Sequence, residues 1–241
     1  MDRKVFVTGG AGGLGMCIVK RHLAMGDRVW ALDMNSSPQT RELSASSENV
    51  TFIRCDITET ANVVAAIGPL LAEIDRLDYL YSCAGIYRFE DKELLPNTIL
   101  DDAASMYEVN AVGYLRVVQA LLGVIRDGCV IMCVTSEAGS VSENWRSAEY
   151  NYCMSKAAQN MANVILYQYF SKDLGHKNTR VLCLHPGWLR TSMGGPEAFK
   201  NPDRSVAPEE CADAIVDIAQ DIHNIPRERM FMDYLRNDIG W

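Results

Sequence analysis

Basic side chains are scarce in this sequence, and so are the features that mark exported or membrane-bound proteins. Only 23 lysines and arginines stand against 31 aspartates and glutamates, which gives a net charge of −8. Because nucleic-acid binding draws most of its affinity from Lys and Arg contacts to phosphates, we expect no nucleic-acid partner. Apolar runs are shorter than the roughly 18–20 residues that cross a bilayer, and residues 1–8 are too few for the apolar part of a signal peptide, so we expect no membrane association.

Paired-cysteine motifs are also missing, although cysteine itself is frequent. No two of the eight cysteines form a Cys-x-x-Cys motif, and several lie inside apolar runs, where a free thiol behaves as a small hydrophobic side chain. We therefore expect reduced thiols and a cytoplasmic location. The four histidines show no metal-ligand spacing, so we expect no metal; they are His22, His176, His185 and His223.

The sequence contains a regular alternation of short β-branched runs with longer stretches of helical period. This alternation is typical of a parallel sheet covered by helices on both faces. It predicts strands near 4–8, 28–33, 50–55, 78–83, 129–135, 180–185 and 229–233, and helices near 13–26, 59–74, 101–126, 151–174 and 208–222. No linker or repeat interrupts the pattern, so we expect residues 1–241 to form one doubly wound α/β domain around about seven strands.

Two of the expected helices, 101–126 and 151–174, are apolar on more than one side. A helix of this kind must be buried on several faces. Two explanations remain open, namely a thick core within the chain and packing of part of each helix against another subunit. The second predicts a homodimer or homotetramer formed through these helices.

A glycine cluster follows the first expected strand, in the segment TGGAGGLG at residues 8–15, and a helix is expected from about Gly13. Glycine permits a tight turn, lets backbone N–H groups approach a pyrophosphate and allows close packing of a helix on a strand. The helix N-terminus favours the negative charge. Any sharp turn uses glycine, but the position between a strand and a helix indicates a dinucleotide-binding loop.

An acidic residue, Asp33, ends the second expected strand, 18 residues beyond Gly15. A carboxylate there accepts hydrogen bonds from the adenosine ribose and repels a 2′-phosphate, so we expect NAD rather than NADP. The alternative is that Asp33 only caps a turn before Asn35. Asp56, just after the third strand, is a candidate for contacting adenine and equally for the N-cap of the next helix.

A tyrosine and a lysine, Tyr152 and Lys156, lie four residues apart at the start of a long expected helix, and hence on one helical face. To act as an acid/base near neutrality, a tyrosine must lose about 3 pKa units, which is roughly 4 kcal/mol. A cation about 4–5 Å away supplies about 3–4 kcal/mol at an effective dielectric constant of about 20. We therefore expect Lys156 to lower the pKa of Tyr152, although this spacing also arises by chance on amphipathic helices.

The glycine loop, Asp33 and the Tyr152–Lys156 pair together resemble the short-chain dehydrogenase/reductase family, and the resemblance covers essentially the whole chain. Further family positions follow in order: SCAG at 82–85, of which only the Ala-Gly half matches the usual Asn-Asn-Ala-Gly, then Asn110, Ser136 and the segment from Pro186 to Thr191. Within the family, residues 185–195 and 233–241 look most like the C-factor-like, carbonyl-reductase-like branch.

This resemblance implies a single NAD(P)-binding Rossmann-fold domain that interconverts a secondary alcohol and a ketone or aldehyde, both small molecules, by hydride transfer. It implies that Tyr152 is the general acid/base, that Ser136 holds the substrate oxygen, that Lys156 lowers the Tyr152 pKa and binds the nicotinamide ribose, and that Asn110 anchors a proton relay. The expected cofactor-binding residues are Tyr152 and Lys156 together with Thr8, Gly9, Gly12, Gly13, Leu14, Gly15, Asp33, Met34, Asp56, Ile57, Cys83, Ala84, Gly85, Pro186, Gly187, Leu189 and Thr191.

Two other functions remain open. The glycine spacing also fits the longer nucleotide-sugar epimerases, although 241 residues leave little room for their sugar-nucleotide region. An NAD-binding regulatory or signalling protein with little turnover is the second alternative, but such a protein has no need of Ser136, Tyr152 and Lys156 in concert.

Two segments, 140–149 and 192–208, are candidate walls of the substrate pocket, and the second has the composition of a mobile lid. Arg146 and Arg190 in or near them are candidates for meeting an anionic group, although a loop arginine is usually only solvated. The aromatic candidates for an apolar wall are Trp145, Tyr150 and Trp188.

Overall fold

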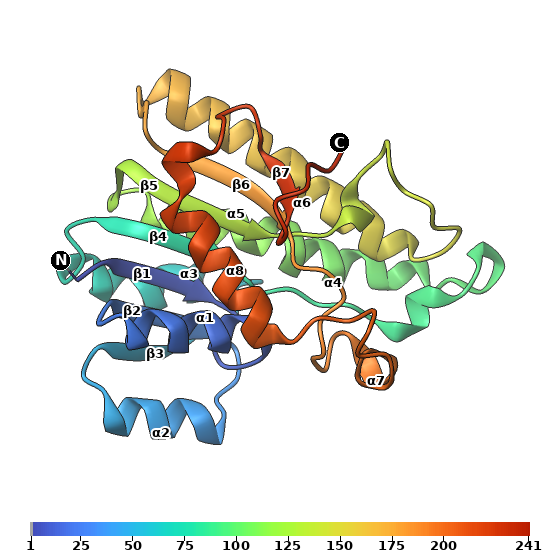
Figure 1. Ribbon diagram of the computed structural model, residues 1–241, viewed down its shortest axis with the longest axis horizontal. Coiled ribbons are helices and arrows are strands. Elements are labelled where there is room, and N and C mark those ends of the chain that lie inside the picture. Colours follow the sequence, from blue (N-terminus) through green and yellow to red (C-terminus); the bar gives the residue numbers. More distant parts are fainter. Residues whose placement is uncertain (1) are drawn as a thin grey trace.

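The computed structural model describes residues 2–241, and this range contains one parallel sheet of seven strands in the order β3-β2-β1-β4-β5-β6-β7 (Figure 1). The chain first builds outward from β1 to β3, then returns to the other side of β1 and continues outward to β7. This reversal opens a crevice at the carboxyl ends of β1 and β4, where proteins with such sheets bind their ligands. The expected doubly wound α/β fold is confirmed.

The strands are short and mostly buried, as a sheet covered on both faces requires. Thr8, at the end of β1, is in register with Leu32 on one side and Ser82 on the other, so that the carboxyl ends of three strands are level. The strands are β1 Lys4–Thr8, β2 Arg28–Asp33, β3 Val50–Arg54, β4 Leu77–Ser82, β5 Ile125–Val134, β6 Arg180–His185 and β7 Phe231–Asp233.

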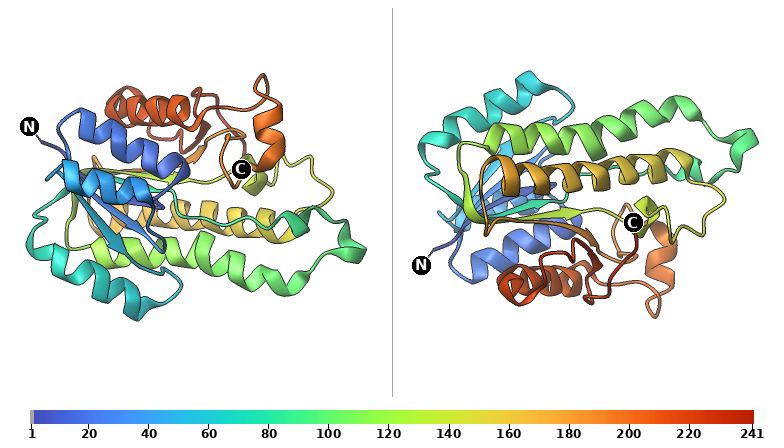
Figure 2. Two further views of the ribbon diagram at one scale, coloured as in Figure 1. Left: turned by 90° about the horizontal axis from the view of Figure 1, so that it is seen from below. Right: turned by 90° about the horizontal axis from the view of Figure 1, so that it is seen from above.

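Helices cover both faces of the sheet (Figure 2). On one face α1 Gly13–Ala24 packs against α8 Pro208–Gln220. The other face is covered by α3 Thr60–Ile67, α5 Tyr114–Leu121 and α6 Tyr150–Gln168, with the short α4 Ala103–Tyr107 leading towards α5. Two small helices lie outside these layers: α2 Pro38–Ser46 beside the edge strand β3, and α7 Gly195–Lys200 beyond the carboxyl ends of the strands (Figure 1).

The apolar core is divided into two clusters by the sheet. Val5 and Val7 belong to the cluster under α1 and α8, whereas Phe6 belongs to the cluster on the opposite face. This follows from the alternation of side chains along a strand. Both clusters continue to the level of Thr8 and Cys133, so the crevice has a rigid floor.

The sequence predicts a helix over 101–126, but the last turn of this range is not helical in the structure. A π-helical segment at Glu108–Gly113 connects α4 with α5, which ends at Leu121, and β5 begins at Ile125 in register with Leu77. Apolar residues continue across this junction, and their periodicity does not mark where a buried helix gives way to a buried strand. The expected helix 151–174 likewise ends in a π-helical segment, Tyr169–Asp173.

Neither α2 nor α7 was expected from the sequence. In α2 Thr40 is the one buried residue, so the helix carries no apolar stripe. It is held instead by its N-terminus, where Ser37 and Thr40 form reciprocal side-chain to backbone hydrogen bonds. Only the capping residues of such a helix can be recognised in the sequence.

The last residues of the chain fasten the segment that follows β5. The Gly240 N–H donates to the Glu143 carboxylate, and the Ser142 N–H donates to the Trp241 carbonyl at 2.7 Å. The Trp241 ring lies 5.4 Å from the Phe231 ring of β7. Among residues 2–241, no helix combines the length and the apolar character needed to cross a bilayer.

Candidate active site

The glycines between β1 and α1 differ in the space around them. A Cβ on Gly9, whose φ is +68°, would lie 2.8 Å from the Ala84 nitrogen, and one on Gly15 would lie 2.2 Å from the Gly9 carbonyl oxygen. These two glycines let α1 and the loop after β4 approach β1 closely. A Cβ on Gly12, by contrast, would meet no atom of residues 2–241 within 4 Å. Open space therefore lies at the N-terminus of α1, and it suits a phosphate group.

The glycine loop faces two other segments that the sequence associates with a cofactor. A Cβ on Gly13 would lie 3.6 Å from the Thr191 methyl carbon, and the Thr8 hydroxyl accepts a hydrogen bond from the Ala84 N–H at 3.2 Å. Leu14 lies in the core below the loop. The loops after β1, β4 and β6 thus meet at one crevice, and these residues are the ones that would hold a dinucleotide.

Asp33, at the end of β2, braces the glycine loop. Its carboxylate accepts hydrogen bonds from the Ala11 N–H at 3.0 Å and from the Asn35 N–H at 2.9 Å. Arg54 of β3 is its register partner, and the Arg54 Nε donates to the Met34 carbonyl at 3.3 Å. A cation therefore lies beside the expected ribose site, and sequence reasoning missed it because it comes from another strand.

Asp56 forms a turn ahead of α3. Its carboxylate accepts hydrogen bonds from the Thr58 backbone N–H and hydroxyl, at 2.9 and 2.8 Å, and these bonds lower its pKa. The N-cap of α3 is Glu59, so the expectation that Asp56 caps this helix is wrong. Ile57 is buried beside Gly113 of the π-helical segment.

Ser136, Tyr152 and Lys156 are brought together at the end of β5 and the start of α6. The Ser136 side chain lies close enough to the Tyr152 phenol to lower its pKa, and its Oγ accepts the Ala138 N–H at 3.1 Å. The Lys156 Nζ lies 5.7 Å from the centre of the Tyr152 ring and donates to the Val134 carbonyl at 3.2 Å. A hydroxyl, a phenol and an amine therefore share one small volume.

The electrostatics of this group differ from the simple pair expected from the sequence. Burial raises the pKa of Tyr152, and the Ser136 side chain lowers it. Burial also lowers the pKa of Lys156, to about 8. The Lys156 Nζ donates to Val134 and, at 2.9 Å, to the Gln159 side chain, so two of its three N–H groups are bonded to these acceptors.

Asn110 ties the loop after β4 to α6. Its side-chain oxygen accepts the Ile86 N–H at 2.8 Å, and its side-chain nitrogen donates to the Ile86 carbonyl at 3.0 Å and to the Ser155 hydroxyl at 2.9 Å. A Cβ on Gly85 would lie 3.2 Å from the Asn110 oxygen. Cys83 begins this loop, and burial raises the pKa of its thiol. Asn110 lies in the π-helical segment, a distortion frequent at functional sites.

The backbone of the segment after β6 is fixed in place by several close contacts. Gly187 has a φ of +76°, and a Cβ on it would lie 3.1 Å from the Tyr234 ring, while the Pro186 carbonyl accepts from the Cys211 thiol. Leu189 pairs with Val206 across the segment.

Arg190 donates to the Ser205 carbonyl at 2.6 Å and to the Pro202 carbonyl at 3.3 Å. One terminal nitrogen of Arg190 is thus used within the segment, and a contact of Arg190 with an anionic group stays a prediction. The Trp188 ring nitrogen donates to the Gly194 carbonyl at 2.9 Å, so this side chain is also fixed within the segment.

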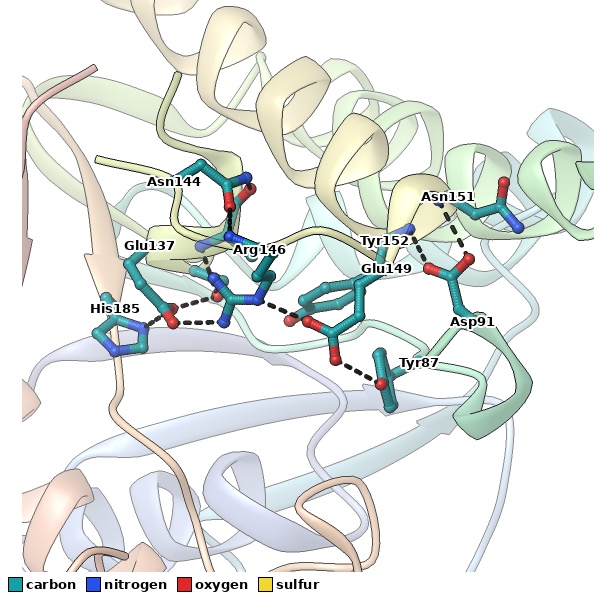
Figure 3. A network of polar contacts seen from close by, with 11 residues as sticks. Tyr87, Asp91, Glu137, Asn144, Arg146, Glu149, Asn151, Tyr152 and His185 are labelled. Atoms are coloured by element: carbon teal, nitrogen blue, oxygen red, sulfur yellow. Dashed lines mark hydrogen bonds and ion pairs between the residues drawn. The ribbon is translucent and has the colours of Figure 1, made fainter. Parts of the chain in front are cut away.

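A network of charged side chains surrounds Ser136 and Tyr152 (Figure 3). Arg146 bridges two carboxylates, at 2.6 Å to Glu137 and 2.5 Å to Glu149. The other oxygen of Glu137 accepts the Ser136 hydroxyl at 2.6 Å and lies 3.0 Å from His185. Burial opposes ionisation of Glu137, but His185, Arg146 and Ser136 lower its pKa to about 2. Arg146 is thus already neutralised, and the expectation that it meets an anion is wrong.

The start of α6 is anchored by Asp91, which sequence reasoning missed. The buried Asp91 carboxylate accepts the N–H groups of Tyr152 and Asn151, at 2.9 and 3.3 Å. Glu149, just before the helix, has a left-handed backbone with φ 64°, and its N–H donates to the Asp91 carbonyl at 2.9 Å. Strain of this kind in a residue with a side chain is frequent at functional sites.

Comparisons with known proteins agree with this geometry. The family model described as short chain dehydrogenase matches residues 3–201. Among curated relatives, "C-signal" of Myxococcus xanthus is 35% identical over 58% of this chain and 79% of its own length. "2-(R)-hydroxypropyl-CoM dehydrogenase" of Xanthobacter autotrophicus is 30% identical over 80% of this chain and 77% of its own.

Solved structures give the same answer. A carbonyl reductase from Pseudomonas aeruginosa PAO1 matches with a TM-score of 0.79 and 25% identity, over 99% of this chain and 100% of that one. An NADPH-bound carbonyl reductase from chicken fatty liver matches with a TM-score of 0.86 and 23% identity, over 100% and 99% of the two chains. The second likeness concerns the fold alone.

Proposed function

The chain belongs to the short-chain dehydrogenase/reductase family and is an oxidoreductase that acts on alcohols or carbonyls with NAD(P), and from this premise we propose that Tyr152 is its general acid/base. Bound nicotinamide supplies or accepts the hydride at its C4 carbon. In reduction, Tyr152 donates a proton to the substrate oxygen, and in oxidation it removes one. Ser136, which lies beside Tyr152, holds the same oxygen.

Lys156 and Asn110 complete the proposed machinery. Lys156 binds the nicotinamide ribose and stabilises the tyrosinate, and Asn110 fixes the loop after β4 against α6 and thereby anchors the proton relay. The residues that would hold the dinucleotide lie in the loops after β1, β4 and β6, around the open space at Gly12. Residues 1–241 work as one domain in this proposal.

The convergence of the Ser136 hydroxyl, the Tyr152 phenol and the Lys156 amine at the end of β5 and the start of α6 is the observation that carries the proposal. Tyr152→Phe tests it. We expect turnover of alcohols and carbonyls to fall by about 10²–10⁴-fold, the usual contribution of an acid/base, while NADH binding measured by fluorescence is retained. A variant that keeps its turnover would contradict the role given to Tyr152.

We also propose that NAD is preferred over NADP, because the Asp33 carboxylate lies where a 2′-phosphate would have to be accommodated. Arg54 is the opposing influence, since it is the register partner of Asp33 and carries the charge that a phosphate would seek. Asp33→Ser should shift the ratio of kcat/KM for the two cofactors towards NADP at least tenfold, and Arg54→Gln should shift it towards NAD. Equal or better activity of the unaltered protein with NADP would overturn this preference.

The similarity to "C-signal" favours a second candidate function, a signalling protein that binds NAD and turns over little. Its output would survive Tyr152→Phe, whereas that of an enzyme would not. The same variant therefore separates the two functions.

We propose that the protein acts in the cytoplasm as a homodimer or homotetramer built through the helices near 101–126 and 151–174. Three large apolar side chains on the outward face of α6 support this assembly: Met154, Met161 and Ile165 are 51%, 59% and 60% exposed. Their spacing of seven and four residues puts them in one stripe. Tyr107 at the end of α4 and Leu115 on α5 add further exposed apolar area.

A further inference from the structure

Proton and hydride transfer require none of the charges that surround Ser136 and Tyr152. The three charged side chains there are largely buried: Arg146 is 13% exposed, Glu137 28% and Glu149 20%. Removing charges from water is expensive even when they are paired, so this arrangement needs a reason beyond folding. Two carboxylates and one guanidinium leave a net charge of −1 in the group.

The positive charge of Arg146 is already compensated by two carboxylates and is not free to bind an anionic ligand. Its Nε donates to Glu149 and one of its terminal nitrogens donates to Glu137. Its other terminal nitrogen, Nη1, is buried and has no hydrogen-bond partner among residues 2–241. This nitrogen is a free donor on a cation that two carboxylates already neutralise, so it suits an uncharged acceptor such as a hydroxyl or ester oxygen.

Glu137 and Glu149 lie on the two sides of Arg146 (Figure 3), and both carboxylates are close enough to raise the pKa of Tyr152. Glu137 is bonded to the Ser136 hydroxyl. Glu149 accepts the Tyr87 hydroxyl at 2.7 Å, and the Tyr87 ring stands edge-on to the Tyr152 ring with 5.0 Å between centres. A substrate oxygen placed between Ser136 and Tyr152 therefore lies near both carboxylates.

Other titratable groups near the network do not reverse its sign. Burial lowers the pKa of His185, against the opposing influence of Glu137 and Asp233. The Asp91 carboxylate, bonded to the first N–H groups of α6, adds further negative charge. The site thus carries an excess of negative charge in a poorly solvated place, where electrostatic interactions are strong.

We propose that Glu137 and Glu149 make this pocket select uncharged or ammonium-bearing alcohols and carbonyls over anionic ones, with Arg146 offering an uncharged oxygen its free N–H. The proposal rests on the proposed function, because it assigns the substrate class of the same site. Like charges placed together in a binding site exclude the wrong ligand more effectively than added contacts select the right one.

A matched pair of ketones tests the selection. 4-Oxopentanoate and its methyl ester share the carbonyl and differ in one negative charge, so we compare their kcat/KM at neutral pH with the reduced cofactor that gives the higher rate. We expect the ester to be preferred at least tenfold by the unaltered protein. Glu149→Gln keeps the shape of the side chain and does not touch Ser136; it should reduce this ratio about tenfold, because the net charge of the network then changes from −1 to zero.

Two further variants make the result independent of any one substitution. Arg146→Met removes the cation and should raise the preference for the ester. Asp75→Asn removes a carboxylate from the Lys4 ion pair at the opposite ends of the strands, and its ratio should equal that of the unaltered protein. A ratio near one in the unaltered protein, or a ratio unchanged by both Glu149→Gln and Arg146→Met, overturns the selection.

Failure of the proposed function gives a different result. If neither ketone nor any other carbonyl is reduced, the assignment of Tyr152 is at fault, and calorimetric binding of the same two ketones still decides the charge preference. Tighter binding of the ester, with a preference that Glu149→Gln reduces, supports the selection. Equal binding of both ketones overturns it.

Discussion

Single polar residues in this protein hold the reactive ones in place. Asp91 accepts the first N–H groups of α6 and thereby sets the height of Tyr152, and Asn110 ties the loop after β4 to the same helix. At the other end of the strands, buried His22 bonds to Asp27 at 2.7 Å and to the Tyr81 hydroxyl at 3.0 Å. Each of these contacts makes a separate prediction.

Asp91→Asn should slow catalysis without weakening cofactor binding. The amide loses one charge-assisted acceptor at the helix N-terminus, which is worth about 0.5–2 kcal/mol, and Tyr152 is then held less firmly. We expect kcat to fall about tenfold while the dissociation constant for NADH is unchanged. Asp101→Asn, an exposed change in the same part of the chain, serves as the control. An increase in KM alone would contradict a positioning role.

His22 should make the folded state sensitive to mild acid. Burial lowers its pKa below the unfolded value of about 6.5, against the influence of Asp27. The folded state then binds fewer protons than the unfolded chain, so stability is complete above pH 6.5 and is lost as pH falls through the folded pKa. Urea unfolding at pH 7.5 and 5.5 measures the loss, which His22→Gln should reduce. The exposed His223→Gln should leave it unchanged, and an equal loss in all three proteins would refute the assignment.

The helices and strands differ in how well their bounds can be predicted from the sequence. β1, β2 and β6 were predicted with the bounds that they have, because each is an apolar run closed by a turn or a helix start. The end of α5 was not, because the chain stays apolar from the helix into β5. Ser136, Tyr152 and Lys156 could be singled out in the sequence because they lie at a strand end and on one helix, and the structure brings them together; their catalytic roles stay predictions. The Glu137–Arg146–Glu149 network could not, because its members come from irregular segments whose contacts only the folded chain defines.

Two glycines of the loop between β1 and α1 should separate folding from binding. Gly15→Ala would put a Cβ 2.2 Å from the Gly9 oxygen and force α1 off β1, so we expect a loss of about 1–3 kcal/mol in stability. Gly12→Ala meets no atom within 4 Å among residues 2–241 and its φ of −164° suits any residue, so stability should be kept. It should still weaken dinucleotide binding at least tenfold if the pyrophosphate occupies that space. Chemical denaturation and NADH titration of both variants provide the comparison.

The whole molecule has two unlike helical layers. In one layer, α1 and α8 bury their apolar side chains against the sheet. In the other layer, the apolar stripe of α6 formed by Met154, Met161 and Ile165 is exposed to solvent. Soluble proteins seldom expose such stripes without a partner. The sequence showed that the expected helices 101–126 and 151–174 are apolar on more than one side. Only the folded chain shows which side packs on the sheet and which side is exposed.

Met161→Glu combined with Ile165→Glu should shift the protein towards the monomer. Charges introduced into an apolar contact must be desolvated for association to occur, so the dissociation constant of the assembly should rise by at least a hundredfold. Sedimentation velocity over a range of concentrations measures this change. Leu235→Glu, which alters an exposed side chain outside these helices, should sediment like the unaltered protein. A monomeric unaltered protein would rule out the assembly.

The hydrogen bonds between residues 240–241 and the segment after β5 have a practical consequence for laboratory evolution. Gly240 has no spare room, since a Cβ there would lie 2.4 Å from the Ser142 hydroxyl and 2.6 Å from a Glu143 oxygen. Libraries randomised around residue 240 should therefore shift residues 142 and 143, which belong to a candidate wall of the substrate pocket, and change the substrate range. Screens limited to the pocket lining would overlook such hits.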